Sequence, residues 1–363
     1  MTTTLVAKDL PKPRVTKLLE RGEYNRPKGG ALQPGIIKVM GAFPKEAPQN
    51  RLGLARWLVN KQNPLTARVI TNRIWQGLFG TGLVRTTEDF GSQGELPSHP
   101  QLLDWIATEY HRTDWDTKAI IRLIVTSSTY RQSSRLTPTS LERDPANRLL
   151  SRAPRYRLSA EVIRDQALYS AGLLNEHIGG RSVRPYQPKG LWKEIASTTD
   201  YDQSTGPDLY RRSLYTYSKR TVTNPTMLAF DASTREACSV RPSRTNTPMQ
   251  ALTLMNDITF TEAARCLAER VLDNSTSNAN DTTRLQLAFL LVVSRLPTEA
   301  ESDILLDNLK HQRSAFQQSP ESAARLAAIG EAPRHAGLDD IDVASWTALT
   351  SLLLNLDEAI NRE

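Results

Sequence analysis

The chain has 363 residues, of which 39% are hydrophobic and 23% are charged, an ordinary composition for a globular protein with a buried core. Its 46 Lys and Arg against 39 Asp and Glu give a net charge of +7, spread along the chain. Anionic partners are therefore permitted, but a dedicated nucleic-acid binder is not expected. The longest apolar run, residues 287–293, is too short to cross a bilayer, so no membrane span is expected.

The residue types that most often carry metal or cofactor chemistry show no recognisable spacing. The only cysteines, Cys238 and Cys266, form no CxxC, CxxCH or zinc pattern, and they either pair or remain free. The five histidines have no ligand spacing, and no GxSxG, P-loop, GxGxxG or HExxH motif occurs. No metal site and no cofactor is therefore predicted in this chain.

Residues 1–50 are predicted to form an extended lead-in. They are rich in Pro, Gly and Lys, and their weak periodicity allows one short strand at 36–40. The start, MTTTLVAKDLPKPRV, lacks the apolar core of a signal peptide. This segment is interpreted as the tail of a preceding domain.

Helical patterns begin at residue 51, where apolar periodicity and capping residues predict four helices in succession. Their sequences are RLGLARWLV, NPLTARVITNRIWQGLF, SHPQLLDWIATEY and DTKAIIRLIVTSSTY. Asn63 is the predicted cap of the second helix and Gly80 its end, while Ser98 and Gln101 have capping-box spacing at the third. The polar stretch 132–147 that follows is predicted to be a loop.

The rest of the chain alternates helices with irregular segments. Ser159 is expected to cap one helix, and residues 178–212 are expected to be irregular. SLYTYSKRTV, residues 213–222, alternates and is the best strand candidate. Further helices are predicted from residue 248, from residue 283, after the capping box of PTEAE, and over 343–361.

Together these patterns predict a mainly α fold, a multi-helix globular array with long irregular loops and a minor β element. The helical domain would cover 51–363, with sub-lobes at 51–135, 148–272 and 283–363.

A cationic stretch, RPSRTNTPMQ, precedes the helix predicted from residue 248. Thr247 can cap this helix, so Arg241, Arg244 and Asn246 would lie beside its unpaired amides. Guanidinium groups at a helix N-terminus can bind a carboxylate, sulfate or phosphate. The alternative is that the arginines pair with acids such as Asp231 and only fix the loop.

A second candidate interleaves aromatic and basic residues in the predicted strand. Tyr215, Tyr217 and Lys219 would share one face, with Arg220 on the other. Tyrosine rings can stack on sugars while the cations hold acidic groups. The alternative is that the tyrosines close a core.

A third candidate lies in a Gly-broken loop between two predicted helices. Glu88, Asp89 and His99 could perform general acid–base chemistry there. The alternative is that the acids bond loop amides and that His99 is simply the first helical residue.

Several long blocks resemble one known family in the family's order, from about residue 50 to the end. They include FDASTREACSVRPSRTNTPMQALTLMND, SVRPYQPKGLWKE, LYRRSLYTYSKRTV and WTALTSLLLNLDE. The chain resembles the C-terminal domain of unknown function of large planctomycete cytochrome-c-associated proteins. The resemblance implies an exported, periplasmic or cell-surface protein with a haem c module elsewhere, and a link to the breakdown of sulfated polysaccharides. It carries over no catalytic residue.

We therefore expect a non-haem helical module of an exported cytochrome-c-type protein that binds an anionic ligand such as a sulfated or acidic glycan. The alternative is a glycan hydrolase that uses a carboxylate pair. Whether the chain is an enzyme is left open. Expected partners are an anionic polysaccharide and a cytochrome-c module or other redox partner. The resemblance implies a periplasmic or cell-surface location, whereas a stand-alone product without an export signal would be cytoplasmic.

Overall fold

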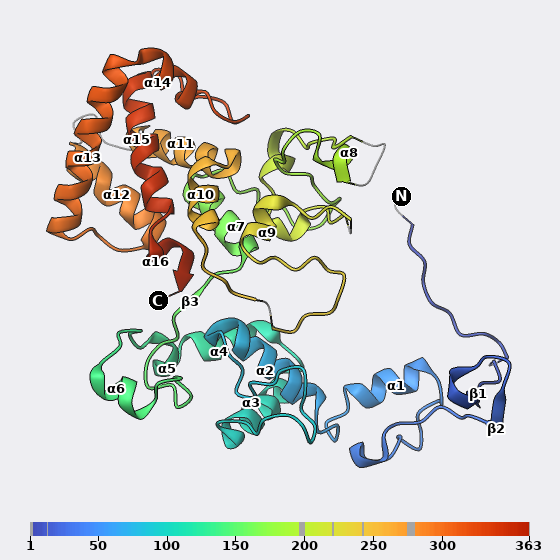
Figure 1. Cartoon of the computed structure of the whole chain (residues 1–363). Helices are drawn as coiled ribbons and strands as arrows, with labels where there is room; N and C mark the ends of the chain where they lie inside the picture. Colours follow the sequence, from blue (N-terminus) through green and yellow to red (C-terminus); the bar gives the residue numbers. More distant parts are fainter. Residues whose placement is uncertain are drawn as a thin grey trace. The chain divides into compact units, whose positions relative to one another are not determined.

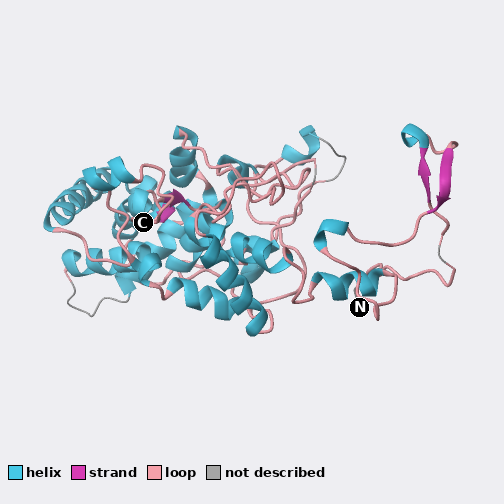
Figure 2. Ribbon diagram, turned by 90° about the horizontal axis from the view of Figure 1, so that it is seen from below, coloured by secondary structure: helices cyan, strands magenta, loops and turns pink. Residues whose placement is uncertain are grey.

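The structure is a computed structural model that describes residues 3–12, 14–195, 200–219, 221–241, 243–273 and 280–362. Helices dominate the chain, and among these residues the strands form only two small two-stranded sheets (Figures 1 and 2). This confirms the predicted mainly α fold. The chain divides into two compact units, Met1–Ala153 and Pro154–Glu363. No helix in the described ranges combines the length and apolar character needed to span a bilayer.

The first unit begins with a hairpin in which β1 (Lys17–Leu19) pairs antiparallel with β2 (Pro27–Ala31), flanking a 3-10 turn at Glu20–Gly22. The strand predicted at 36–40 is wrong, because the structure has a 3-10 helix at Lys38–Met40. The amides of Met40 and Gly41 donate to the carbonyls of Ile37 and Lys38. These local hydrogen bonds satisfy backbone groups that would have no hydrogen-bond partner in an unpaired strand.

Six helices follow in the first unit. They are α1 (Arg51–Leu58), α2 (Thr66–Phe79), α3 (Pro100–Arg112), α4 (Thr117–Val125), α5 (Ser128–Arg131) and α6 (Pro138–Arg143). Their core centres on Trp75, which stacks on Phe79 with ring centroids 4.2 Å apart, and on Ile106 and Ile120. The core of this unit therefore lies between α2, α3 and α4.

Local capping in this unit differs from the sequence prediction at two places. The Ser98–Gln101 capping box is not formed, because Ser98 Oγ lies 3.0 Å from His99 Nδ1 and no side chain caps α3. The predicted loop 132–147 contains α6, which Thr137 and Ser140 start with a reciprocal capping box. At α2 the prediction holds in part, because Asn63 Oδ1 accepts from Thr66 N and Gly80 ends the helix with φ 76°.

The second unit contains ten α-helices, long and short, among its described residues. They are α7 (Ala160–Ser170), α8 (Leu191–Ile195), α9 (Pro225–Ala229), α10 (Pro248–Asn256), α11 (Ile258–Asp273), α12 (Asp281–Val293), α13 (Glu299–Gln318), α14 (Pro320–Ala327), α15 (Asp340–Leu354) and α16 (Asp357–Ile360). Two 3-10 helices span Gly206–Tyr210 and Ser213–Tyr215, and β3 (Tyr156–Arg157) pairs with β4 (Asn361–Arg362). The predicted helix 343–361 is thus two helices, since α15 ends at Leu354.

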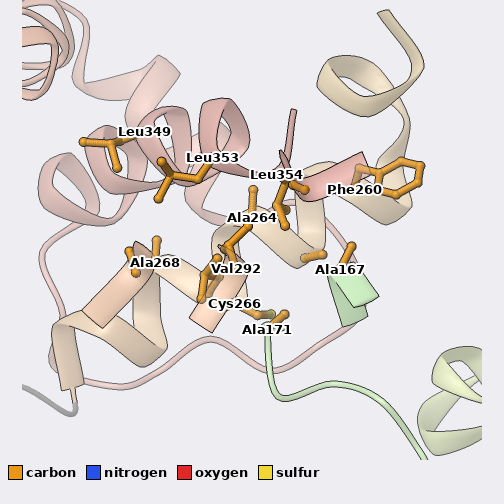
Figure 3. Close-up of a cluster of buried hydrophobic side chains, with 14 of the residues drawn as sticks. Ala167, Ala171, Phe260, Ala264, Cys266, Ala268, Val292, Leu349, Leu353 and Leu354 are labelled. Atoms are coloured by element: carbon orange, nitrogen blue, oxygen red, sulfur yellow. The ribbon is translucent and has the colours of Figure 1, made fainter. Parts of the chain in front are cut away.

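The core of the second unit lies where α11 packs on α15 (Figure 3). Small side chains on α11, such as Ala264 and Ala268, allow the two helices to approach closely. Leu349 and Leu353 of α15 are buried there, and Thr350 Oγ1 donates to the Ala264 carbonyl at 2.8 Å. Burial of each leucine contributes about 1.5–3 kcal/mol. Helix α7 joins this core through Ala167 and Ala171.

Buried arginines hold the irregular segments onto these helices. Arg164 of α7 donates to the carbonyls of Leu209 and Arg211 at 2.9 and 3.0 Å. Arg211 in turn donates to the carbonyls of His177 and Arg181. A guanidinium has five donors, so one side chain can satisfy several carbonyls that no helix or sheet pairs. Residues 178–195 and 200–212 are irregular apart from short helices, largely as predicted, and the rest of the predicted irregular segment lies outside the described residues.

The predicted strand 213–222 is wrong. Ser213–Tyr215 is a 3-10 helix, and the described residues of the segment, 213–219 and 221–222, form only single bridges, at Thr216 with Val183 and at Lys219 with Val222. Asp165 accepts from both the amide and the hydroxyl of Ser213 at 2.7 Å, which starts the turn. A tertiary hydrogen bond therefore overrides the alternating pattern.

Candidate ligand-binding site

The cationic loop before α10 is fixed by Asp231. Its carboxylate accepts from Thr245 N at 2.7 Å and pairs with the buried Arg157. Burial alone would raise the pKa of Asp231, but the hydrogen bonds from Thr245 and the charge of Arg157 outweigh burial and lower it. Gln250 reaches back to the Thr247 amide at 3.5 Å, as the sequence predicted.

The predicted anion-binding residues lie on the surface of this loop. Arg241, Arg244 and Asn246 are exposed, and Arg244 stacks over the Tyr156 ring at 4.4 Å. Partial burial lowers the pKa of Arg244. An anion site at these residues stays a prediction.

The second predicted group, the interleaved aromatic and basic residues of the predicted strand, is only partly brought together. Tyr215 helps to hold the irregular segment, because its hydroxyl accepts from Gly179 N at 2.8 Å and its ring lies 3.9 Å from the Arg211 guanidinium. Lys219 contacts a residue that the sequence did not single out, with Nζ 4.1 Å from the centre of the Trp192 ring. Arg220 lies outside the described residues.

Lys219 belongs to a group of cations and aromatic rings, which we call the Trp192 cluster: Arg184, Trp192, Tyr201, Tyr217 and Lys219. Trp192 meets Tyr201 edge to face at 5.0 Å and Tyr217 at 6.0 Å. The Arg184 guanidinium lies 5.1 Å from the Tyr217 ring and 5.8 Å from the Trp192 ring. Burial raises the pKa of Tyr201, so its phenol stays protonated.

This region also concentrates hydrogen-bonding atoms that no described residue satisfies. The buried atoms Lys219 Nζ, Trp192 Nε1, Gln187 Nε2 and Thr216 Oγ1 have no hydrogen-bond partner within the described part of the chain. Buried polar groups are normally paired, and an exception in a native protein commonly marks a place where a water, ion or ligand binds. Three of the four atoms are pure donors, so each of these three lacks an acceptor.

Next to the cluster lies a shallow, solvent-open hollow of about 40 Å³, which we call the Tyr217 hollow. Tyr217 forms part of its lining and so belongs to both features. Its charged lining residues are Glu161, in the first turn of α7, and Arg235. Its hydroxyl groups come from Ser213, Thr216, Ser218, Thr223 and Ser233. The lining of the hollow therefore offers hydrogen-bond donors and acceptors around the Tyr217 ring.

The acid–base candidates of the first unit take part in fixing their loop. Asp89 Oδ1 accepts from Gly91 N at 2.7 Å, and Glu95 pairs with Arg148 at 3.2 Å. Glu88 is exposed, and His99 precedes α3 and lies beside Ser98. The hydrolase alternative built on these residues stays a prediction. Within the described ranges, no group of three or more His, Cys, Asp or Glu side chains could hold a metal.

Sequence reasoning missed Arg184, Trp192, Glu161 and Arg235. The first two lie close together in SVRPYQPKGLWKE, where basic and aromatic residues alternate with Gly and Pro, a signal that could have drawn attention to them. Glu161 looks like an ordinary first-turn acid, and Arg235 like an ordinary loop residue. Only the packing of an irregular segment against α7 brings Arg235 and Glu161 to one hollow.

The fold and the candidate site define a mainly α protein whose long loops carry a cationic and aromatic surface. The chain belongs to the PSD1 family, proteins of unknown function (DUF1553), whose model matches residues 50–309. No curated protein and no solved structure matches the chain.

Proposed function

We propose that the chain is the non-haem helical module of an exported cytochrome-c-type protein and that it binds an acidic glycan, sulfated or uronic, at the Trp192 cluster. The resemblance to planctomycete cytochrome-c-associated proteins supports the context, a periplasmic or cell-surface location and a haem-bearing partner module. The ligand proposal rests on the surroundings of the Lys219 ammonium group.

The Lys219 ammonium lies against the Trp192 ring, and its nitrogen is shielded from solvent without a hydrogen-bond acceptor among the described residues. A cation–π contact compensates only part of the hydration that a buried ammonium loses. A sulfate or carboxylate group would supply the missing acceptor as a charge-assisted hydrogen bond. Arg184, which lies over Trp192 and Tyr217 and pairs with the exposed Asp202 at 3.6 Å, adds a second cation at the Trp192 ring.

The aromatic rings favour a glycan among possible anions. Aromatic faces bind the apolar faces of sugar rings, while their edges and neighbouring donors meet the hydroxyl groups. Tyr217 is 44% exposed, so its ring is accessible for such a contact. Arg241, Arg244 and Asn246, before α10, form a second cationic surface that a long polysaccharide could contact.

Calorimetric titration of the full chain with a sulfated polysaccharide and with a polyuronate tests this proposal. We expect Lys219→Met to weaken binding by about tenfold or more, which corresponds to about 1.4 kcal/mol. Lys189→Met removes one exposed lysine close in sequence and serves as the matched control, with an expected change below about twofold.

Arg244→Ala, titrated in parallel, separates the two cationic surfaces. If Arg244→Ala abolishes binding while Lys219→Met leaves it unchanged, the ligand binds before α10 and the Trp192 cluster is the wrong site. If the unsubstituted chain binds neither polymer, the ligand proposal is wrong altogether.

A further inference from the structure

We infer that the Tyr217 hollow is a subsite for one hydroxyl-bearing sugar ring, so that the ligand is recognised as a carbohydrate and not only as a polyanion. This inference rests on the proposed function, since the acidic group of the glycan is held by the Trp192 cluster. Tyr217 lines the hollow and carries Arg184 on its ring, so the two features are contiguous.

The charge of Glu161 is the main reason for this assignment. Its carboxylate lines the hollow, and no described residue forms a hydrogen bond or ion pair with it. A carboxylate accepts hydrogen bonds but donates none, so it repels sulfate and carboxylate groups and binds hydroxyl groups. An acid in a hollow beside a cationic cluster therefore fits a sugar ring better than a second anion.

Arg235 complements Glu161 as a donor. Its guanidinium also lines the hollow without a described partner, and its backbone adopts the left-handed conformation with φ 61°. This conformation is uncommon for residues other than glycine and is often found at binding sites. A hydroxyl group both donates and accepts, so a sugar can satisfy Glu161 and Arg235 at once.

Thr216 is also a lining residue of the hollow, and its buried hydroxyl oxygen lacks a partner among the described residues. Ser218 and Thr223 add two more hydroxyl groups. The volume of about 40 Å³ is far below the range of about 300–1,000 Å³ for sites that enclose a small molecule. The hollow therefore takes the hydroxyl groups along one edge of a sugar ring that rests over it, while the rest of the glycan lies outside.

The test compares two polymers of similar charge density, a sulfated polysaccharide and poly(vinyl sulfate), which has no sugar rings. Glu161→Gln in the full chain is expected to weaken binding of the polysaccharide at least fivefold and to leave binding of poly(vinyl sulfate) unchanged or tighter. Glu236→Gln removes one negative charge from an exposed neighbouring position and is the matched control. It should not distinguish the two polymers.

Thr216→Val keeps the side-chain shape and removes the hydroxyl group, and it should show the same selectivity as Glu161→Gln. The inference is overturned if both variants bind the two polymers like the unsubstituted chain, or lose both equally. If the unsubstituted chain binds neither polymer, the proposed function fails together with the inference. Urea unfolding of each variant verifies that the second unit remains folded.

Discussion

In the irregular segments of the second unit, buried arginine side chains satisfy carbonyls that no helix or sheet pairs. Arg157, Arg164, Arg211 and Arg265 are each 5% exposed or less, and each donates to carbonyls of irregular segments. Burial lowers the pKa of the Arg164 guanidinium. Its hydrogen bonds to the carbonyls of Leu209 and Arg211 nevertheless hold the side chain in this buried position. The irregular segments that carry the Trp192 cluster therefore depend on two of these guanidiniums, those of Arg164 and Arg211.

Arg164→Met should destabilise the second unit strongly. The substitution leaves the carbonyls of Leu209 and Arg211 without partners, at about 1–3 kcal/mol each, so a loss of about 2–6 kcal/mol is expected. Urea unfolding measures this loss. Arg181→Met, at an exposed position, should change stability by less than about 0.5 kcal/mol. Equal effects of the two substitutions would contradict the role given to Arg164.

The two cysteines should differ in reactivity, because neither is in a disulfide, Cys238 is exposed and Cys266 is buried. Burial raises the pKa of Cys266 to about 12, so little thiolate forms at neutral pH. A chromogenic disulfide reagent should therefore titrate one thiol in the native protein and the second only after unfolding. In Cys238→Ser the native protein should show none. A fast reaction of Cys266 in the native state would show that α11 packs differently.

At the scale of single elements, local signals in the sequence predicted many helix starts. Ser159 caps α7, and Thr298 with Glu301 forms the capping box of α13, as their spacing indicated. The failures come from contacts with distant residues. Asp165 turns the start of the predicted strand 213–222 into a 3-10 helix, and no local pattern encodes that bond.

The cap of α13 should make stability depend on pH. Hydrogen bonds from Arg295 chiefly lower the pKa of Glu301 from 4.5 to about 2. A lowered carboxyl pKa contributes stability above pH 4.5, and this contribution is lost as the pH falls toward 2. The side chains of both residues are about one-third exposed, so solvent screening leaves about 1 kcal/mol. Glu301→Gln should remove this acid-dependent loss in urea unfolding from pH 5 to pH 2, whereas Glu299→Gln should preserve it.

Gly330 should be essential for the loop after α14. It has φ +92°, and an added Cβ would overlap the Glu262 side chain. Glu262 accepts from Ala332 N at 2.7 Å and from the Tyr210 hydroxyl at 2.8 Å, so a displaced carboxylate would lose both bonds.

Gly337 is the matched control for Gly330, because it has φ +95° but open space around the added Cβ. Gly337→Ala should cost only the backbone strain, about 1–2 kcal/mol. Gly330→Ala should cost at least about 2 kcal/mol more, since Glu262 loses its buried hydrogen bonds. Similar unfolding free energies for the two variants would contradict this packing.

At the scale of the whole molecule, the mainly α architecture was predictable because helical periodicity recurs along most of the chain. The candidate site was predictable only in part. Lys219 and the tyrosines stood out as an alternating pattern, but Trp192 and Arg184 come from a separate segment that the chain folds back onto them. Neither the composition of the chain nor the spacing of its residues predicts that two such irregular segments come into contact.

The division into two units predicts that each folds by itself. A fragment covering 154–363 contains all of the helices and buried arginines of the second unit, so it should unfold cooperatively in urea. Its midpoint, followed by circular dichroism, should agree with one transition of the full chain. A fragment that lacks a cooperative transition would show that the second unit requires the first.

Hydrogen–deuterium exchange of the full chain, with and without a sulfated polysaccharide, locates the ligand most directly. We expect the polysaccharide to slow exchange in residues 183–193 and 213–219, which carry all of the Trp192 cluster except Tyr201 and one side of the Tyr217 hollow. The first unit should exchange at an unchanged rate. Protection confined to α10 and the loop before it, or to the first unit, would contradict the account.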